Sequence, residues 1–390
     1  MVRFFDKTPP EIIFHIGHFK TGTTALQVFF QANRGKLARQ GLVYARTHEK
    51  LAKHSPLAHV LYHEAGVQSL LYNFQPPAPA RDMWQALFDE ALALKGGQSL
   101  LVSSEEFMRL GAHPGAEAAL RALIDTVRDR LRFRVVCYLR APQSHLESWY
   151  NQLIKIGFDV PGFDATVEQV MEPIHWDYAQ ALRPWIDIFG RDAVILRGFT
   201  PALRRDDAMY RDFLNAIGQP FPARAGTPDA DPNPRLDEKL LPIKRGMQHV
   251  PARRWVKTAM MQDVDSALSA ETRAPQWSEP RPPLTFEQIR DRALTGLDTL
   301  AALPGAALDL AAMRADPPRP QDPARRETAE MFAILSSEIA RLRERLATQA
   351  QRIKTLEDQL GKPQAPAPAK APDETPAKAQ GKAPGKDTPQ

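Results

Sequence analysis

Cysteine is almost missing from this chain, whose 390 residues include only Cys137. An internal disulfide framework is therefore excluded, and nothing in the sequence requires an oxidising compartment. Uninterrupted apolar runs fall short of the roughly 18 residues that a membrane-spanning helix needs. Residues 1–7 lack the apolar core of a secretory signal. We therefore expect a cytoplasmic protein with no membrane span, and we interpret Cys137 as a buried apolar residue because its neighbours are apolar.

Neither positive nor negative charge strongly predominates. The chain has 51 Lys and Arg residues against 46 Asp and Glu residues, which gives a net charge of +5. This balance is compatible with an anionic ligand but does not require one. Large apolar residues are absent from residues 361–390, which are rich in Pro, Ala and Lys. That tail cannot bury a core and is predicted to be disordered. It also contains acids and no aromatic residue, which argues against nucleic-acid binding.

Short apolar segments alternate with amphipathic ones through the first half of the chain. The predicted strands are 11–17, 99–103, 133–139 and 193–196, and the predicted helices are 23–40, 82–95, 116–131, 142–156, 176–189, 206–217, 234–250 and 285–303. Buried strands that alternate with helices are typical of a parallel sheet covered on both faces. The sequence therefore predicts an α/β fold, a P-loop-like three-layer sandwich within a domain at 1–310.

A heptad repeat occupies residues 326–360, after a linker at 311–325 that is rich in proline and charge. Its seam alternates steps of four and three through Leu335, Ile339, Leu342, Leu346, Gln349, Ile353, Leu356 and Leu360. A seam of about four heptads with charged flanks predicts a coiled coil through which the chain forms a homo-oligomer. The alternative is a single helix that packs back on the globular domain.

The first predicted strand leads into a loop rich in glycine and threonine, and a helix follows directly. The residues of this loop that suit an anion are Gly17, Lys20, Thr21, Gly22, Thr23 and Thr24. Unpaired N–H groups at a helix start bind anions, so this context predicts a phosphate-binding loop. The glycine spacing matches a nucleoside-triphosphate loop, but Thr23 stands where that loop has its lysine. An ordinary strand-to-helix turn is the alternative.

A second polar pattern follows the predicted strand 133–139. Arg140 stands at the end of that strand, and Ser148 lies eight residues later on the next predicted helix. Ligands of open α/β sheets bind at the carboxyl ends of the strands, so the guanidinium and the hydroxyl can converge on one phosphate. The spacing alone is a weak signal, since Arg140 could pair with a carboxylate and Ser148 could face solvent.

Both patterns resemble signatures of the sulfotransferase superfamily, and the resemblance covers roughly residues 11–250. Residues 15–27 are similar to the loop that holds the 5′-phosphosulfate of the co-substrate 3′-phosphoadenosine 5′-phosphosulfate. The resemblance implies that Lys20 bonds the leaving phosphate and the migrating sulfuryl group. In the second signature, at 138–152, it implies that Arg140 and Ser148 bind the 3′-phosphate. It also implies that no metal is needed, and the sequence shows no His or Cys cluster with ligand spacing.

Transfer of a sulfuryl group to a hydroxyl requires a base that takes the hydroxyl proton. Glu105 and Glu106 follow a predicted strand and so lie at the same sheet edge as Lys20. Carbohydrate-directed members of the superfamily often use a glutamate, which implies Glu105 as the base and a saccharide as the acceptor. Glu106, His15 and His18 remain rival bases, and both acids could instead cap a helix or face solvent.

Two further features lie outside these signatures. Residues 243–246, Ile-Lys-Arg-Gly, have the composition of a superfamily loop that closes over the nucleotide. His54, His59 and His63 fall in a helix-like stretch. They either line an acceptor cleft or lie on the surface, which is the simpler interpretation.

Two other classes of protein compete with a sulfotransferase. A P-loop kinase or nucleotide hydrolase would share the glycine spacing, but the displaced Lys20 argues against it. A catalytically inactive scaffold would act through its coiled coil alone. Lys20, Glu105 and Arg140 all stand at the positions that the resemblance requires, which argues against a scaffold.

Overall fold

The computed structural model describes residues 9–68, 74–95, 97–158, 160–227, 252, 253, 255, 284–321 and 323–360, with no side-chain detail for 323–338. The helix predicted at 234–250, the loop at 243–246 and the tail at 361–390 lie outside the described residues. The chain divides into two compact units, Met1–Arg341 and Leu342–Gln390.

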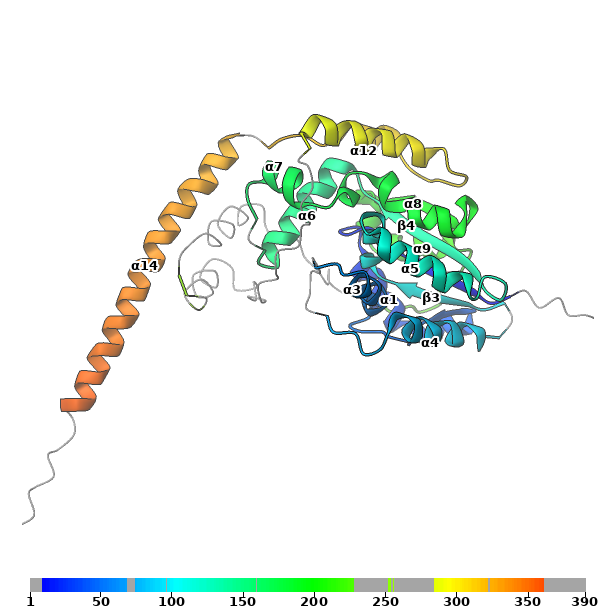
Figure 1. The fold of residues 1–390 in the computed structure, drawn as a ribbon, viewed down its shortest axis with the longest axis horizontal. Helices are drawn as coiled ribbons and strands as arrows, with labels where there is room; N and C mark the ends of the chain where they lie inside the picture. The colour runs from blue at the N-terminus through cyan, green and yellow to red at the C-terminus, as the bar shows by residue number, and fades with distance from the viewer. Residues whose placement is uncertain are drawn as a thin grey trace, which may run out of the picture. The chain divides into compact units, whose positions relative to one another are not determined.

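Five parallel strands form the central sheet of the first unit in the order β2–β3–β1–β4–β5 (Figure 1). Their bounds are β1 Glu11–His15, β2 Leu42–Tyr44, β3 Ser99–Ser103, β4 Arg132–Leu139 and β5 Val194–Gly198. His15 at the end of β1 lies opposite Ser103 of β3 and Val136 of β4. Because the strands all run in one direction, the loops that follow β1, β3 and β4 meet at one edge of the sheet.

Successive residues of β1 point into two separate apolar cores, as the two-residue period of a strand requires. Ile12 and Phe14 belong to one core, and Ile13 belongs to the other. The first core is covered by α3 Ser55–Glu64, α4 Ala80–Leu92, α5 Pro114–Asp125 and α8 Tyr178–Phe189, and the second by α1 Thr23–Ala32, α2 Arg34–Arg39 and α9 Ala208–Ala216. The predicted α/β three-layer sandwich is therefore confirmed.

The helix predicted over 23–40 is broken at Asn33 into α1 and α2. The Asn33 side-chain amide donates to the carbonyl oxygens of Phe29, at 2.9 Å, and of Gly226, at 2.7 Å. Asparagine competes for backbone hydrogen bonds in this way and ends a helix that the apolar pattern alone would continue. The sequence pattern also misses the strand β2, because three residues show too little of a two-residue period.

The other elements of the first unit surround this sandwich. They are η1 Glu105–Ala112, α6 Pro142–Lys155, α7 Phe163–Ala165, η2 Thr166–Val170, η3 Pro173–His175, η4 Arg191–Ala193, η5 Pro201–Arg204, α12 Phe286–Ala301 and α13 Leu310–Arg314. The helix predicted at 285–303 is α12, and it packs against α8 (Figure 1). The N–H of Ala307 donates to the carbonyl oxygen of Leu196 at 3.0 Å. The segment after α12 thus extends the sheet beside β5.

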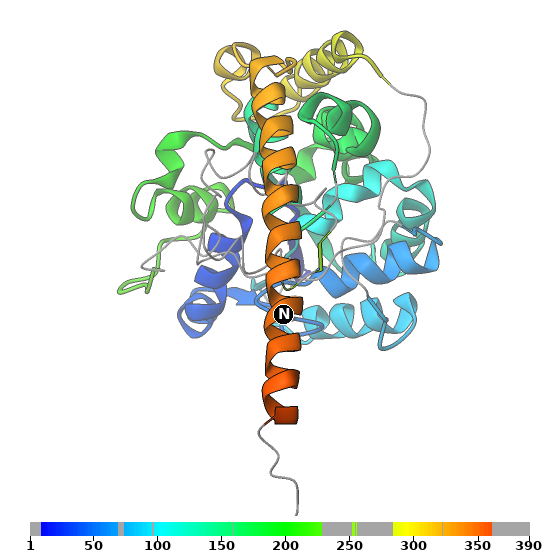
Figure 2. The same cartoon turned by 90° about the vertical axis from the view of Figure 1, so that its left-hand side faces the viewer.

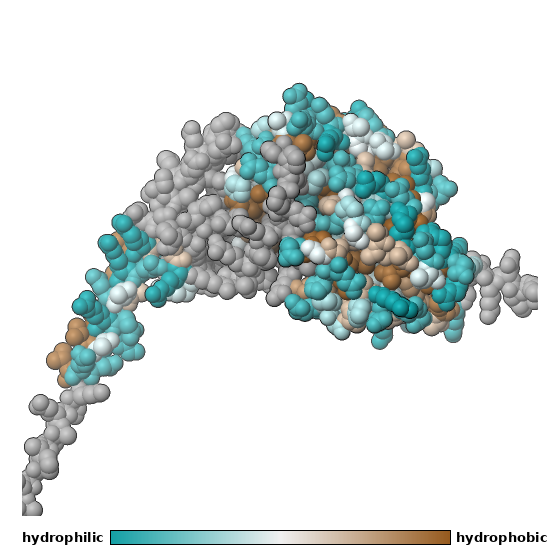
Figure 3. All heavy atoms as spheres, in the orientation of Figure 1, coloured by the Kyte–Doolittle hydropathy of each residue, from teal (hydrophilic) through white to brown (hydrophobic). Residues whose placement is uncertain are grey.

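The helix α14, Pro323–Leu360, runs continuously through the predicted coiled-coil region (Figures 1 and 2). Its seam is exposed, from 49% at Ile339 to 64% at Leu346 and 85% at Leu360. In the view of Figure 3 the coloured part of α14 is largely hydrophilic, with hydrophobic side chains near its C-terminal end. No helix among the described residues combines the length and the apolar character needed to cross a membrane.

A buried ion cluster joins η1 to the segment before η3. Arg109, 2% exposed, donates to both carboxylate oxygens of Glu172, at 2.9 and 2.6 Å. His113 Nε2 lies 3.0 Å from the same carboxylate. Burial raises the pKa of Glu172, but the charge and hydrogen bonds of Arg109 outweigh burial and hold that pKa well below its usual range. The carboxylate therefore stays ionised in the interior because of Arg109.

Replacing Arg109 by methionine should lower the free energy of unfolding by about 3–5 kcal/mol, because a carboxylate would stay buried without its charge partner. The folded-state pKa of Glu172 lies below its unfolded value, so the stabilisation is present at neutral pH and is lost as the pH falls through the lowered pKa. Urea unfolding at neutral pH measures the change. The matched control is Arg121→Met, which removes a partly exposed pair with Glu117 and should cost less than about 1 kcal/mol. Equal losses for the two variants would contradict this assignment.

Candidate active site

The loop between β1 and α1 has a backbone conformation that few residue types adopt. Gly17, Lys20 and Gly22 have positive φ angles of 51°, 65° and 79°. A Cβ atom at Gly17 would lie 2.6 Å from Thr23 Oγ1, and one at Gly22 would lie 3.2 Å from the ring of Phe199. The left-handed backbone and these close neighbours explain both glycines. Lys20 adopts the same region without being glycine, and backbone strain of this kind is concentrated at functional sites.

Two hydroxyl groups brace the loop from within. Thr21 Oγ1 donates to the carbonyl oxygen of His18 at 2.6 Å and accepts from the His18 N–H at 3.1 Å, and Thr23 Oγ1 donates to the same carbonyl at 3.3 Å. Because those two hydroxyl groups bond the loop itself, Thr24 is the threonine whose hydroxyl is left for the predicted contact with a ligand, and it is half-buried. No described side chain caps the start of α1, so its first N–H groups are positioned for an anion.

Lys20 connects this loop with α6, the helix that carries the second predicted pattern. Its Nζ donates to Gln152 Oε1 at 3.1 Å. Gln152 lies one helical turn after Ser148, on the same face of α6. Arg140 lies just before this helix. Burial lowers the pKa of His145, and nearby charges that include Arg140 and Lys20 lower it further. The Lys20 ammonium group therefore lies against the helix that carries Ser148, and the charges of Lys20 and Arg140 both act on His145 of that helix.

Glu105 follows β3 at the same edge of the sheet and has a network of its own. Lys53 Nζ donates to Glu105 Oε1 at 2.7 Å, and Gln27 Nε2 of α1 donates to Oε2 at 3.1 Å. Burial raises the pKa of this carboxyl group, but the charge and hydrogen bond of Lys53 outweigh burial and lower the pKa to about 2. Glu105 is therefore ionised, as a base must be, but its proton affinity is low while Lys53 remains paired with it.

The two rival histidine bases are fully buried. His15 Nδ1 lies 2.8 Å from Ser103 Oγ, and burial lowers the pKa of His15 to about 3. His18 Nε2 donates to the carbonyl oxygen of Ile174 at 2.9 Å. Burial lowers the pKa of His18 to about 4, against the opposing effect of that hydrogen bond. Glu105 is the more accessible of the three candidate groups, with a side chain 12% exposed.

Glu106 of η1 and two of the three histidines in and next to α3 occupy the interior. Glu106 is 3% exposed, and its Oε2 lies 3.6 Å from His59 Nε2. His54 and His59 are buried at 0% and 6% exposure, so their interpretation as surface residues is wrong. The physical reason is that α3 packs against α4, α5 and η1 at once. Only for His63, which is exposed, is the surface interpretation correct.

The sequence patterns did not identify three side chains of this site, which are Gln27, Lys53 and Gln152. Gln27 lies one turn after Thr23, and Gln152 lies one turn after Ser148. Helical spacing from the predicted ligand residues could therefore have suggested both. Lys53 lies in the loop before α3, and no local pattern links it with Glu105.

The single cysteine has a structural position beneath the phosphate-binding loop. Cys137 is fully buried in β4, as expected, and its Sγ donates to the carbonyl oxygen of Gly17 at 3.2 Å. Burial raises the pKa of the thiol well above its usual range. A thiol of this kind supports the loop and is a poor nucleophile.

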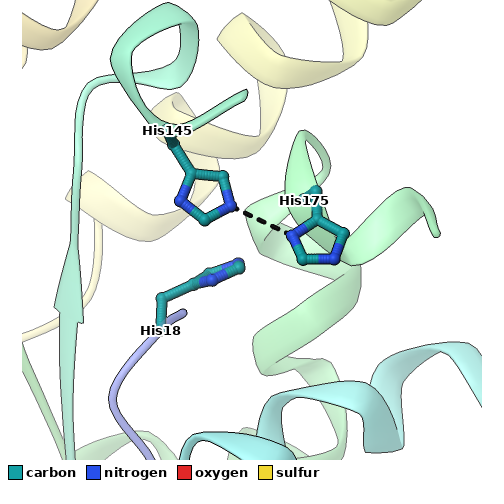
Figure 4. A group of neighbouring side chains, drawn as sticks. All are labelled: His18, His145 and His175. Carbon is teal, nitrogen blue, oxygen red and sulfur yellow. Dashed lines mark hydrogen bonds between the residues drawn. The ribbon is translucent and has the colours of Figure 1, made fainter. Parts of the chain in front are cut away.

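Three histidines from distant segments meet behind the loop (Figure 4). They are His18 of the loop, His145 of α6 and His175 at the end of η3. One ring nitrogen of each lies within 4.8 Å of the others, a spacing from which imidazoles can hold a metal ion. The sequence shows no His or Cys cluster with ligand spacing and did not predict this group, because spacing along the chain cannot reveal residues that only the fold brings together.

Comparisons with protein-family models and with curated proteins find no match for this chain. Among solved structures, the chain is similar to the crystal structure of a sulfotransferase from Alicyclobacillus acidocaldarius, with 19% sequence identity and a TM-score of 0.36. That similarity covers 66% of this chain and 96% of the other. A similarity of this size establishes neither family nor activity, so function has to be inferred from the site itself.

Proposed function

We propose that this protein is a sulfotransferase that moves the sulfuryl group of 3′-phosphoadenosine 5′-phosphosulfate to a hydroxyl group. The observation that carries the proposal is the hydrogen bond from Lys20 to Gln152 at 3.1 Å. It places the ammonium group of the strained loop against the helix that follows Arg140 and carries Ser148. Cationic groups at the ends of neighbouring strands suit a nucleotide with phosphates at two positions.

The proposed reaction is an in-line displacement at sulfur. The acceptor oxygen forms a bond to sulfur while the bond from sulfur to the 5′-phosphate oxygen breaks, which releases adenosine 3′,5′-bisphosphate. Lys20 and the N–H groups at the start of α1 would stabilise the negative charge that grows on the leaving oxygen. Glu105 would receive the acceptor proton, and the chemical step uses no metal ion.

Arg140 and Ser148 are assigned to the 3′-phosphate. The hydroxyl of Tyr178 donates to the Arg140 carbonyl oxygen at 2.8 Å and fixes the backbone at the end of β4. Ser148 is 2% exposed, so its hydroxyl is buried and not in bulk solvent. A guanidinium on a fixed backbone can form two parallel hydrogen bonds to a phosphate.

The acceptor is proposed to be a saccharide, in view of the carboxylate at the position of the base. The direct test incubates the full chain with donor carrying labelled sulfate and with panels of saccharides and phenols. We expect label on at least one saccharide. Hydrolysis of magnesium-bound ATP without sulfate transfer would favour the P-loop kinase or hydrolase alternative. Donor binding without transfer to any acceptor would favour the inactive scaffold.

The pair of Lys53 and Glu105 predicts how transfer depends on pH. In the wild type a pKa of about 2 keeps Glu105 ionised, so kcat/KM should show no acid limb from this group in the neutral range. Lys53→Gln removes the opposing charge and leaves burial, which raises the pKa of a carboxyl group above its ordinary value of about 4. We expect the variant to lose activity as the pH falls through that raised pKa, because the base becomes protonated.

The matched control for this pH profile is Lys50→Gln, which removes an exposed lysine of the same loop. It should keep the wild-type profile. Glu105→Gln should retain donor binding while transfer falls by about 10²-fold or more. A wild-type rate in Glu105→Gln would reassign the base.

The partner of α14 is proposed to be a second copy of this chain. The exposed seam places Ile339 and Ile353 at the a positions and Leu342 and Leu356 at the d positions. Isoleucine at a positions with leucine at d positions favours a parallel pair of helices.

Ile353→Lys should convert the dimer to a monomer, because it places a charge in the middle of the apolar seam. Light scattering coupled to size-exclusion chromatography measures the mass. Thr355→Lys adds the same charge outside the seam and should remain dimeric. A wild-type chain that is monomeric at micromolar concentration, or a dimeric Ile353→Lys, would contradict the proposed pairing.

A further inference from the structure

The three-histidine cluster of His18, His145 and His175 lies in the interior of the first unit, each ring at most 1% exposed. The rings come from the phosphate-binding loop, α6 and η3, and Figure 4 shows them turned toward one another. Ring centroids of His18 and His145 are 4.1 Å apart, and those of His145 and His175 are 5.3 Å apart. Three polar rings buried this closely require a reason beyond packing.

A hydrogen bond defines which nitrogen of His18 carries the hydrogen. The carbonyl oxygen of Ile174 can only accept, so the His18 Nε2 that lies 2.9 Å from it carries the hydrogen. The other nitrogen, Nδ1, is then an unprotonated acceptor, and it is buried with no hydrogen-bond partner among the described residues. Metal-binding histidines typically donate their second ring nitrogen to a backbone carbonyl in this manner.

His145 shows a similarly incomplete pairing. His145 Nε2 lies 3.1 Å from His175 Nδ1, so one of these nitrogens donates to the other. His145 Nδ1 is also buried without a hydrogen-bond partner in the described structure. Leaving a buried polar atom unsatisfied is destabilising.

We propose that His18, His145 and His175 form a binding site for a divalent transition-metal ion, with zinc as the best match. Imidazole is a preferred ligand of zinc, cobalt, nickel and copper, and a set of three histidines is an established zinc coordination that leaves a fourth position for water. Zinc–nitrogen bonds of about 2.0–2.1 Å place tetrahedral ligands roughly 3.4 Å apart. A separation at the limit of 4.8 Å would have to shorten by about 1.4 Å, whereas His145 Nε2 and His175 Nδ1 are already 3.1 Å apart.

The position of the site gives the metal a structural role next to the anion site. His18 lies two residues before Lys20, and His145 lies three residues before Ser148. A metal ion bound to both would tie the phosphate-binding loop to α6 and would hold the two predicted ligand groups in a fixed relation. The nearby positive charges of Lys20 and Arg140 oppose a dication and limit its affinity.

The test uses the full chain without a histidine tag, stripped of metal with a chelator and then titrated with Co²⁺ and Zn²⁺. We expect one equivalent of either ion per chain, with the intense visible absorption of tetrahedral cobalt. His145→Gln and His175→Gln should each weaken binding by about 100-fold or more. His59→Gln is the matched control, since it removes a buried histidine outside the cluster. Equal binding by His59→Gln and His145→Gln would overturn the proposal.

A second measurement, made on the wild-type protein, tests the metal site even if the variants fail to fold. X-ray absorption at the zinc edge of the wild-type protein should show three imidazole nitrogens at about 2.0–2.1 Å. A shell made only of oxygen atoms, or no zinc retained after dialysis, would mean that the cluster binds water and not metal. Sulfate transfer is not part of either readout, so the metal site and the proposed activity can fail independently.

Discussion

Lys20→Met should lower kcat for sulfate transfer by about 10²–10³-fold, the loss expected when one preorganised donor to a developing oxyanion is removed. The backbone strain at Lys20 and its hydrogen bond to Gln152 hold the ammonium group at the loop before any ligand arrives. Binding of the product nucleotide should weaken less than the rate falls, because the charge on the leaving oxygen is greatest in the transition state. Steady-state kinetics with product-binding titrations measures both quantities.

The strained backbone at Lys20 makes it possible to distinguish a catalytic role of its side chain from a structural one. Lys20→Gly relieves the positive φ of 65° while it removes the ammonium group. We expect the free energy of unfolding to stay equal or rise by up to about 1 kcal/mol, while transfer falls as far as in Lys20→Met. Lys50→Met, on an exposed lysine, is the control and should change neither. A large loss of stability in Lys20→Gly would indicate that the side chain serves the fold.

Arg140→Ala should weaken binding of adenosine 3′,5′-bisphosphate by about 2–5 kcal/mol, the usual effect of removing one partner of a buried charge pair. Binding of adenosine 5′-phosphate, which lacks the 3′ group, should change little. The difference between the two nucleotides therefore isolates the contact to the 3′-phosphate, and calorimetric titration measures it.

The control for this comparison is Arg132→Ala, at the opposite end of the same strand β4 and exposed to solvent. It should leave the affinity for both nucleotides unchanged. If Arg140→Ala weakens both nucleotides equally, Arg140 does not recognise the 3′-phosphate and the second half of the proposed donor site is lost.

Local patterns were sufficient for much of this fold. The apolar runs at β1, β3 and β4 identify the central strands because each is buried on both faces and bounded by turn residues. The seam of α14 follows from its steps of four and three. The loop around Lys20 could be read from glycine spacing, since only glycine tolerates the backbone and neighbours found at Gly17 and Gly22.

What the sequence could not supply are relations between distant segments. Lys53 determines the pKa of Glu105, yet it lies in a loop with no pattern of its own. The break at Asn33 depends on a hydrogen bond to Gly226. The histidines at 18, 145 and 175 meet only after α6 and η3 have packed against the loop. Propensity and periodicity describe neighbours along the chain, and these contacts arise from tertiary packing.

Calorimetric titration of the full chain with adenosine 3′,5′-bisphosphate and, separately, with magnesium-bound ATP tests the proposed ligand most directly. Because the lysine of the loop stands before the second glycine and Arg140 is the proposed ligand of the 3′-phosphate, we expect tight binding of the bisphosphate and little or none of the triphosphate. Tight binding of magnesium-bound ATP with no heat from the bisphosphate would contradict the assignment of this site to a sulfotransferase.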